Sequence, residues 1–314
     1  MYIIISTAIT VLSITVFIFV FTYLCFCRAC KRSSHRDPAA KGKINTSKYK
    51  QFEEKMKLHL LEYEKMPKED ISICSFDSLL LHASYIASPI EEKKLIIAFH
   101  GYRSCAAADF SPVADTLLKE GYSLILPDQR SHGKSEGKYI GFGALERFDA
   151  RSWCEYAVTR FGENIKIYLY GISMGAATVT LASSLNLPKQ VKGIVADCGF
   201  SSPKEIIKNT IWHQNKIPPY PTIYFMNFWS RILAKCDLFS LSSTEEVKKS
   251  KLPLLLIHGA EDRYVPTEMS KLIYQARSEG SELMLVENAR HARSHIVDTQ
   301  KYISAMTNFF LHLK

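Results

Sequence analysis

Residues 167–185 read IYLYGISMGAATVTLASSL, an apolar run followed by a Gly-Ile-Ser-Met-Gly turn and a helical segment. This G-x-S-x-G pattern lies between a strand and a helix, where a tight turn strains the backbone of Ser173 and lifts its hydroxyl above the sheet. Gly171 and Gly175 let other backbone approach without a Cβ clash. The helix directs the positive end of its dipole at an oxyanion formed there. We therefore predict that Ser173 is a nucleophile; the alternative is a glycine-rich turn whose serine only caps a helix.

Strand-like and helix-like segments alternate on both sides of this turn. Short apolar runs occupy residues 71–76, 79–87, 95–99, 122–127, 165–170, 191–196, 252–258 and 282–286. Helical patterns occupy residues 49–66, 109–119, 147–160, 174–186, 267–279 and 295–313. Runs such as LIIAFHG and LLLIHG are apolar on both faces, which is typical of strands covered by helices on both sides. The alternation predicts an α/β fold with a mostly parallel central sheet and helices on both faces.

A serine nucleophile needs a base to remove its proton and an acid to orient that base. Asp262 follows the strand-like LLLIHG, and His291 lies in the loop after the last predicted strand. The chain order is therefore serine, acid, histidine, as expected for a serine on a strand-to-helix turn. We predict that Asp262 is the acid and His291 the base. Alternatives remain open, namely Glu261 or Asp197 for the acid and His295 for the base.

A reacting carbonyl also needs donors for its oxyanion. The backbone N–H groups of Tyr102, which follows a His-Gly pair at a strand end, and of Met174, which follows the serine, are predicted to provide them. His100 is expected to orient this loop rather than to act as a base.

The polar segment 128–135, DQRSHGKS, follows another strand. We expect a structural turn in which Asp128 and Arg130 satisfy backbone groups near the site; the alternative is a second site, for example for a phosphate. The sequence contains no GxGxxG, P-loop, HExxH or Cys-His zinc spacing. We therefore predict no metal, no nucleotide and no other cofactor.

The chain begins with an apolar segment. Residues 1–27 contain no Asp, Glu, Lys, Arg or His. As a helix, residues 3–27 would rise roughly 37 Å, enough to cross a hydrocarbon core of about 30 Å. A cleaved signal peptide would have a basic start, a shorter apolar stretch and a small-residue cleavage site. The segment lacks these features, so we predict a retained transmembrane anchor at residues 3–27.

Basic side chains gather directly after this anchor. Of the 314 residues, 40 are Lys or Arg and 31 are Asp or Glu, for a net charge of +9, and residues 28–50 hold eight of the basic residues and one acid. The rest of the chain is nearly neutral, so no nucleic-acid partner is expected. The positive-inside rule places this flank, and with it the catalytic body, on the cytoplasmic side. The flank is also suited to anionic lipid head groups.

The chain is thus predicted to have three parts, which are the anchor, a basic linker at residues 28–50 and a folded domain at residues 51–314. Within the domain, residues 200–250 are rich in aromatic side chains and show no strand pattern. They predict helices and loops inserted between two strands as a lid over a pocket; the alternative is ordinary surface packing.

These motifs resemble the α/β-hydrolase superfamily, and most of all the membrane-anchored bacterial hydrolases of its serine aminopeptidase/esterase-like branch. The resemblance covers about residues 70–312 and rests on AFHGYRS, PDQRSHGKSEG, YGISMGA, ADCGF, IHGAEDRYVP and ENARHARSH, in that order. It implies the α/β-hydrolase fold, with Ser173 as nucleophile, His291 as base, Asp262 as acid and oxyanion amides at Tyr102 and Met174. One position departs from the pattern, because Arg290 precedes the histidine where the family often has Gly. This departure concerns the conformation of the loop rather than the identity of the base.

The sequence as a whole predicts a membrane-anchored serine hydrolase that cleaves carboxylic esters through an acyl-enzyme. The expected partner is a small-molecule acyl substrate, with lipid-derived esters favoured by an anchor that holds the pocket near a bilayer. A serine peptidase or an acyltransferase would use the same three residues, and an inactive membrane-tethered binding module is a further alternative. Comparison of ester with aminoacyl-amide substrates, and labelling by a fluorophosphonate, would distinguish them.

Overall fold

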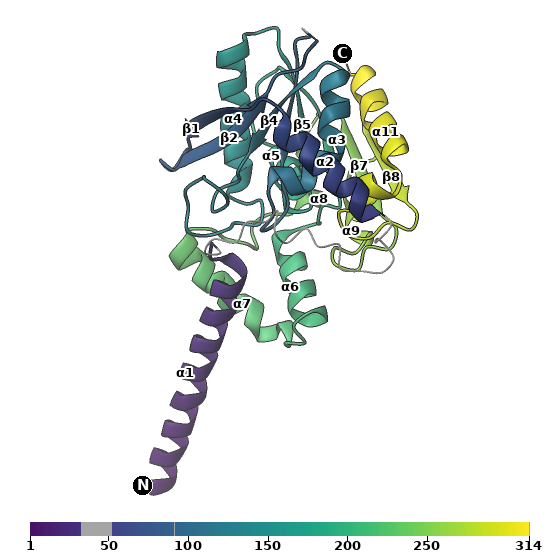
Figure 1. The fold of residues 1–314 in the computed structure, drawn as a ribbon. Helices are drawn as coiled ribbons and strands as arrows, with labels where there is room; N and C mark the ends of the chain where they lie inside the picture. The colour runs from purple at the N-terminus through teal and green to yellow at the C-terminus, as the bar shows by residue number, and fades with distance from the viewer. Residues whose placement is uncertain (33–51, 91, 314) are drawn as a thin grey trace.

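An eight-stranded sheet forms the centre of the body, and helices cover both of its faces (Figure 1). The computed structural model describes residues 1–32, 52–90 and 92–313. The strands are β1 (Glu69–Cys74), β2 (Leu80–Ile86), β3 (Lys94–Phe99), β4 (Tyr122–Pro127), β5 (Lys166–Ile172), β6 (Val191–Asp197), β7 (Leu254–Gly259) and β8 (Ser281–Val286). Their order across the sheet is β1-β2-β4-β3-β5-β6-β7-β8. The β1–β2 and β2–β4 pairs are antiparallel and the other neighbouring pairs are parallel, so the predicted mostly parallel α/β sheet is confirmed.

The central strands are buried on both faces, which explains their unbroken apolar runs. In β3, Ile96 and Ala98 join one core cluster, whereas Leu95 and Ile97 join the cluster on the opposite face. Successive side chains of a strand point to opposite faces, so both faces of this strand need apolar residues. The helices around the sheet are α2 (Glu53–Lys65), α3 (Ala106–Lys119), α4 (Glu146–Phe161), α5 (Met174–Ala182), α9 (Glu268–Ala276), α10 (Ser294–Val297) and α11 (Thr299–Leu311).

The C-terminal helix is interrupted, although the sequence pattern predicts one helix over residues 295–313. Asp298 has φ −141° and ψ 78°, which is not helical, and it separates α10 from α11. Its carboxylate accepts a hydrogen bond of 3.0 Å from the N–H of Lys301. Aspartate is a preferred N-cap residue because it satisfies a free N–H of the first turn, so a new helix starts here.

Four helical segments connect β6 to β7. They are α6 (Pro203–His213), α7 (Pro219–Trp229), the π-helical turn η3 (Ser230–Ala234) and α8 (Ser243–Lys249). The first of them begins where Ser202 accepts the N–H of Glu205 at 3.1 Å and Pro203 occupies the first turn, both favourable at a helix start. As predicted, this region has helices and loops. However, α8 packs against α5 and α9 as part of the body, so only α6 and α7 project from the sheet (Figure 1).

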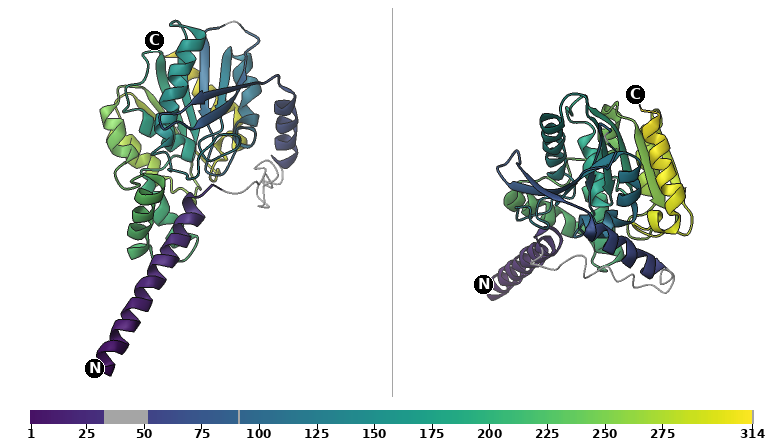
Figure 2. Two further views of the ribbon diagram at one scale, coloured as in Figure 1. Left: turned by 90° about the vertical axis from the view of Figure 1, so that its left-hand side faces the viewer. Right: turned by 45° about the horizontal axis from the view of Figure 1, so that its top comes forward.

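The N-terminal helix α1 (Tyr2–Cys30) extends away from the body and is long and apolar enough to cross a membrane (Figure 1). It continues past the predicted boundary at Cys27, and its last turns pack beside α7 (Figure 2). Phe26 and Cys30 are fully buried there. The start of the predicted linker is thus part of this docked helix end, whereas residues 33–50 lie outside the described residues.

Candidate active site

Ser173 occupies the one-residue turn between β5 and α5. Its φ of 57° and ψ of −112° are strained for a residue with a side chain, and its N–H donates to the carbonyl of Asp197 at 2.8 Å. The turn requires glycine on both sides. A Cβ on Gly171 would lie 2.2 Å from the Gly175 carbonyl oxygen, and one on Gly175 would lie 1.8 Å from that of Phe99. The close approach of these backbones therefore explains the G-x-S-x-G spacing.

The structure brings Ser173, His291 and Asp262 together. His291 Nε2 lies 2.9 Å from Ser173 Oγ, and His291 Nδ1 lies 2.7 Å from Asp262 Oδ2. An ionised carboxylate only accepts hydrogen bonds, so Nδ1 carries the imidazole proton. The lone pair of Nε2 then faces the serine hydroxyl, which is the arrangement that allows the imidazole to remove its proton.

Asp262 is held in the turn after β7 by hydrogen bonds to both carboxylate oxygens. Oδ1 accepts the N–H groups of Tyr264 at 2.8 Å and Val265 at 2.9 Å, while Oδ2 faces His291 and, at 3.3 Å, Nε2 of His258. Burial alone would raise the pKa of Asp262, but the hydrogen bonds from His258 and His291 outweigh it and hold this pKa well below its usual range. Asp262 is therefore ionised at neutral pH, as a carboxylate that supports an imidazolium must be.

The three alternative site residues are engaged elsewhere or form no such contact. The Asp197 carboxylate accepts the hydroxyl of Tyr302 at 3.0 Å, and burial raises the pKa of Asp197 to about 6. His295 is buried in α10, and among the described residues neither of its ring nitrogens has a hydrogen-bond partner. Burial lowers the pKa of His295 to about 3. His291 bonds to the carboxylate of Asp262 rather than to that of Glu261.

The backbone of the loop that carries His291 explains why glycine is not needed at Arg290. The left-handed backbone positions of this loop are Asn288, with φ 61°, and Ala292, with φ 51°. Arg290 is not among the residues with positive φ. An arginine therefore fits at this position without the strain that glycine relieves.

The two predicted oxyanion donors lie at the ends of neighbouring strands. Met174 is the first residue of α5, where the N–H has no carbonyl one turn earlier to bond. The loop that carries Tyr102 runs against the serine, since a Cβ on Gly101 would be 3.4 Å from Ser173 Cβ. His100 supports this loop through Nε2, which accepts the N–H of Gln129 at 3.1 Å.

The segment 128–135 is a structural turn, but the expectation that Arg130 satisfies backbone groups is wrong. Its buried guanidinium bonds instead to both carboxylate oxygens of Asp149, at 2.6 and 2.7 Å, and of Asp77, at 2.9 and 3.0 Å. A buried arginine needs such charged partners, and both are far away in the sequence. Asp128 does satisfy backbone, because it accepts the N–H of Lys134 at 2.8 Å.

Three ligating groups cluster at this site, namely Cys198 Sγ, Asp262 and His291, all within 4.8 Å of one another. His291 Nδ1 bonds to the Asp262 carboxylate at 2.7 Å and His291 Nε2 faces Ser173 Oγ at 2.9 Å, so both ring nitrogens are already engaged. The donor set therefore does not fit a metal ion.

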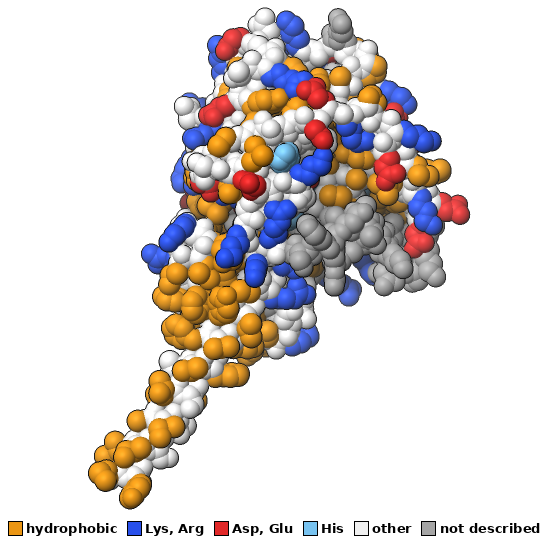
Figure 3. Space-filling view, turned by 60° about the vertical axis from the view of Figure 1, so that its left-hand side comes forward, with side chains coloured by type: hydrophobic (Ala, Val, Ile, Leu, Met, Phe, Trp, Pro, Cys, Tyr) orange, Lys and Arg blue, Asp and Glu red, His pale blue; other side chains and the backbone are white. Residues whose placement is uncertain are grey.

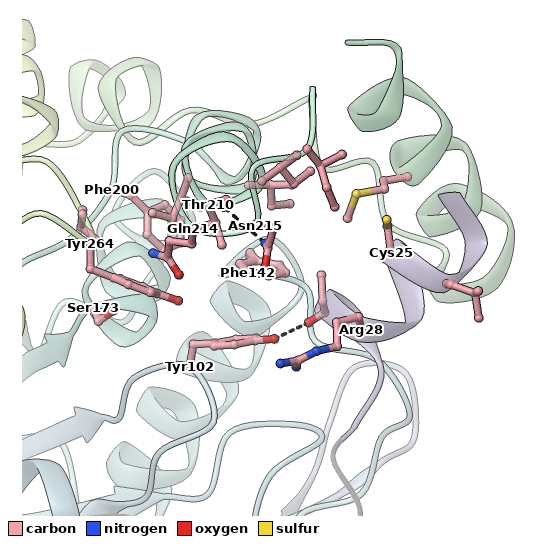
Figure 4. A pocket seen from close by; sticks show the side chains of 18 of the residues that line it. Cys25, Arg28, Tyr102, Phe142, Ser173, Phe200, Thr210, Gln214, Asn215 and Tyr264 are labelled. Carbon is pink, nitrogen blue, oxygen red and sulfur yellow. Dashed lines mark hydrogen bonds between the residues drawn. The ribbon is translucent and has the colours of Figure 1, made fainter. Parts of the chain in front are cut away.

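A cavity of about 400 Å³ opens over Ser173, and α1 forms part of its wall (Figure 4). Sequence patterns did not single out most of its residues, because they come from elements that are distant along the chain. The lining consists of Phe21, Leu24, Cys25, Arg28, Ala29, Tyr102, Phe142, Ser173, Phe200, Ile206, Ile207, Thr210, Ile211, Gln214, Asn215, Ile217, Met226, Tyr264 and Val265. The Tyr264 ring also contacts the His291 ring, with centroids 4.8 Å apart.

Comparison with known proteins agrees with this fold. A family model described as serine aminopeptidase, S33, matches residues 90–236. The uncharacterised protein YqkD of Bacillus subtilis is 23% identical over 225 residues, which is 72% of this chain and 73% of that protein. Esterase YjfP of Escherichia coli is 26% identical over 253 residues, or 76% of this chain and 96% of that protein. Human protein ABHD12B is 27% identical over 200 residues, which is 61% of this chain and 52% of that protein.

Solved structures show the same architecture. The Pyrococcus furiosus esterase Pf2001 superposes with a TM-score of 0.66 at 25% identity, covering 80% of this chain and 93% of that one. Est1E of Butyrivibrio proteoclasticus, solved with ferulic acid, has a TM-score of 0.59 at 18% identity, covers 77% of this chain and 99% of that one, and supports the fold alone. Taken with the family model and the sequence relatives, these likenesses show that the chain belongs to the α/β-hydrolase superfamily and is a serine hydrolase of the esterase type.

Proposed function

We propose that this chain is a membrane-anchored hydrolase that cleaves carboxylic esters through an acyl-enzyme on Ser173. The observation that carries the proposal is the pair of contacts made by His291, 2.9 Å to the serine hydroxyl and 2.7 Å to Asp262. His258 also lies between a serine, Ser270, and the Asp262 carboxylate, but Ser270 is fully buried in α9. Ser173 instead lies on the strained turn and lines the cavity.

The reaction follows from these contacts. His291 Nε2 takes the proton of Ser173 Oγ as this oxygen attacks the ester carbonyl, and the ionised Asp262 stabilises the imidazolium. The N–H groups of Tyr102 and Met174 bind the oxyanion, and each such donor is worth about 3–4 kcal/mol of transition-state stabilisation. The imidazolium then protonates the leaving alkoxide. Water attacks the acyl-enzyme by the same route, with His291 again as base, and releases the acid.

The lining of the cavity favours esters over the substrates of an aminopeptidase. A peptidase that removes an N-terminal residue must bind the substrate's ammonium group, for which a carboxylate is the natural partner. None of the described residues that line the cavity is Asp or Glu. Most are apolar, which suits an acyl chain.

The proposal also retains α1 as an anchor, since its C-terminal end is built into the body. The carbonyl of Ala29 accepts the hydroxyl of Tyr102 at 2.7 Å, and the carbonyl of Arg28 accepts Nη2 of Arg103 at 2.7 Å. A cleaved signal peptide would take these partners away. The basic residues Arg28, Lys31 and Arg32, with Arg36, support a cytoplasmic body and an external N-terminus.

The test is a substrate comparison on the purified full chain in detergent micelles. We expect hydrolysis of p-nitrophenyl esters and at least a hundredfold lower kcat/KM for aminoacyl p-nitroanilides. Ser173→Ala should remove both activities. The control Ser278→Ala, at an exposed serine, should retain them. A preference for the amides would favour the peptidase, and acyl transfer to an added alcohol without hydrolysis would favour the acyltransferase. A folded wild-type chain that cleaves neither substrate and resists fluorophosphonate would favour the binding module.

A further inference from the structure

We infer that α1 is a wall of the substrate pocket as well as an anchor, and that the pocket takes one long acyl chain of an ester that enters from the bilayer. This inference rests on the proposed function of Ser173. It concerns which substrate reaches the serine and by which route, rather than the reaction itself.

The part of α1 that lines the cavity is one face of the helix. Phe21, Leu24, Cys25 and Arg28 follow the i, i+3, i+4, i+7 spacing of one helix face, so their side chains lie on one side. From the first to the last of them the helix rises about 10 Å. Figure 4 shows Ser173 at one end of the labelled side chains and Cys25 and Arg28 at the other, with Tyr102 between them. The cavity therefore runs from the reactive hydroxyl to the membrane helix.

This wall is fixed to the catalytic loop. Tyr102, whose N–H is a proposed oxyanion donor, holds the carbonyl of Ala29 through its hydroxyl. Its neighbour Arg103 donates to the carbonyls of Arg28, at 2.7 Å, and Lys31, at 3.2 Å. Tyr102 and Arg103 therefore hold the end of α1 against the loop that carries the proposed oxyanion donor.

The facing wall belongs to α6 and α7 and is joined to α1 by aromatic side chains. Ile207 and Ile211 of α6 and Met226 of α7 are buried and line the cavity. Phe19 of α1 packs edge-to-face on Trp229 at the end of α7, with ring centroids 5.7 Å apart. Such pairs stabilise a defined arrangement of the helices. We call the last turns of α1 together with α6 and α7 the helical cap.

The outer surface of the helical cap is apolar where it adjoins the membrane helix. On α7, Tyr220, Tyr224 and Phe228 are exposed, and on α6 Trp212 is half exposed, at 50%. Figure 3 shows the hydrophobic surface of α1 continuing onto the adjoining part of the body, where Lys and Arg side chains begin. An apolar surface of this extent, rimmed by aromatic and basic residues, is typical of the membrane interface. The cap therefore lies at the level from which an acyl chain leaves the bilayer.

The size and chemistry of the cavity indicate one chain. Its volume of about 400 Å³ is near the lower end for small-molecule pockets, which run from about 300 to 1,000 Å³. Its far end is lined by Phe21, Leu24 and Cys25, which offer an alkyl chain only weakly polar contacts. The geometry thus directs the ester at Ser173 and the end of its acyl chain at α1.

The first test narrows the cavity from the side of α1 in the full chain, reconstituted in phosphatidylcholine vesicles. Cys25→Trp fills the far end, and the matched control Val20→Trp places the same side chain on an exposed position of the same helix, which is 53% exposed. Each buried methylene is worth about a fourfold change in kcat/KM at most. We expect Cys25→Trp to lower the ratio of kcat/KM for p-nitrophenyl palmitate to that for the butyrate at least tenfold. Val20→Trp should leave this ratio within twofold of wild type.

A second variant covers the case in which Cys25→Trp does not fold. Phe21→Ala extends the cavity along α1, so the preferred acyl chain should become longer. An unchanged chain-length profile in whichever of these variants folds would overturn the inference. Labelling of Ser173 by a short fluorophosphonate separates this failure from failure of the proposed function. A wild-type chain that is unlabelled and inactive refutes the proposed function, whereas a labelled chain with an unchanged profile refutes only the pocket wall.

The route is tested by surface dilution. Palmitoyl ester is kept at a fixed bulk concentration while unlabelled phosphatidylcholine lowers its mole fraction in the vesicles. Access from the bilayer predicts that the rate for the wild-type chain falls in proportion to the mole fraction. A rate that follows the bulk concentration instead would mean that the ester arrives from water, and would overturn the proposed route.

Discussion

The catalytic edge of the sheet, where Ser173, Asp262 and His291 meet, is built in a different way from the helical cap above it. At the edge, each functional group is held by hydrogen bonds of 2.7–2.9 Å on the ends of buried strands. In the cap, apolar side chains from three separate helices pack around a cavity, and part of their surface is exposed. Under the proposed function the edge determines the reaction and the cap determines the substrate, so changes to the two regions should be separable.

The largest effect is expected at the edge, from removal of the base. His291→Ala should lower kcat/KM by about 10⁴-fold or more, because a serine hydroxyl is a weak nucleophile without it. Because the loss of kcat/KM arises in the chemical step and not in binding of the acyl chain, it should be equal for butyrate and palmitate esters. The measurement uses the reconstituted chain. A loss that depends on chain length would break the proposed separation between edge and cap.

A smaller effect is expected from the acid. Asp262→Asn should lower kcat by about 10³–10⁴-fold, again equally for all esters, because the neutral amide no longer stabilises the imidazolium or fixes its tautomer. Glu261→Gln, at the neighbouring position, is the matched control and should stay within twofold of wild type. Equal losses in the two variants would indicate that the turn, rather than the carboxylate of Asp262, is what the reaction needs.

Changes in the cap should be smaller and should depend on the substrate. Met226 is buried in α7 and lines the cavity. Met226→Ala should cost about 2–4 kcal/mol of unfolding free energy. It should also lower kcat/KM several-fold for palmitate and less for butyrate. Thermal unfolding in detergent and the two ester assays measure these effects, and an equal loss for both esters would place Met226 among the supports of the edge.

The smallest effect concerns stability in acid. It is tested by comparing the buried His295 with the exposed His312. Burial lowers the pKa of His295 to about 3 from an ordinary 6.5, so the unfolded chain binds a proton in this range that the folded chain does not. Stability is therefore lost as pH falls from 6.5 towards 3, by about 2 kcal/mol at pH 5. His295→Phe should reduce the difference in Tm between pH 8 and pH 5, whereas the exposed His312→Phe should not. An unchanged difference in His295→Phe would show that this histidine does not contribute to acid sensitivity.

The meeting of Ser173, Asp262 and His291 at one edge of the sheet could be predicted because the signals for it are local. A strand, a turn with two obligatory glycines and a helix follow one another within a few residues around Ser173. Asp262 and His291 each follow a recognisable apolar strand, and parallel strands bring such ends to one edge of the sheet. The partners of these residues were not all predictable, since His258 supports Asp262 from within a buried strand whose sequence looks purely structural.

The cap could be predicted only in outline. The aromatic stretch between β6 and β7 indicates helices, but not that α8 returns to the body or that α1 becomes a wall of the cavity. The contacts of α1 with α7 join residues about two hundred positions apart, and those of α8 with α5 join residues about seventy apart. No spacing along the chain records either set. The same reason explains the error at Arg130, because its partners Asp77 and Asp149 are found only when the sheet has formed.

The central claim is that an acyl group is transferred to Ser173. Rapid mixing of the wild-type chain with p-nitrophenyl butyrate, followed by acid quenching and peptide mass spectrometry, tests it directly. We predict a butyryl mass increase on the peptide that contains Ser173, a burst of p-nitrophenol of matching size, and neither in Ser173→Ala. A butyryl group on another residue would contradict the account. So would hydrolysis of the ester by Ser173→Ala at the rate of the wild-type chain.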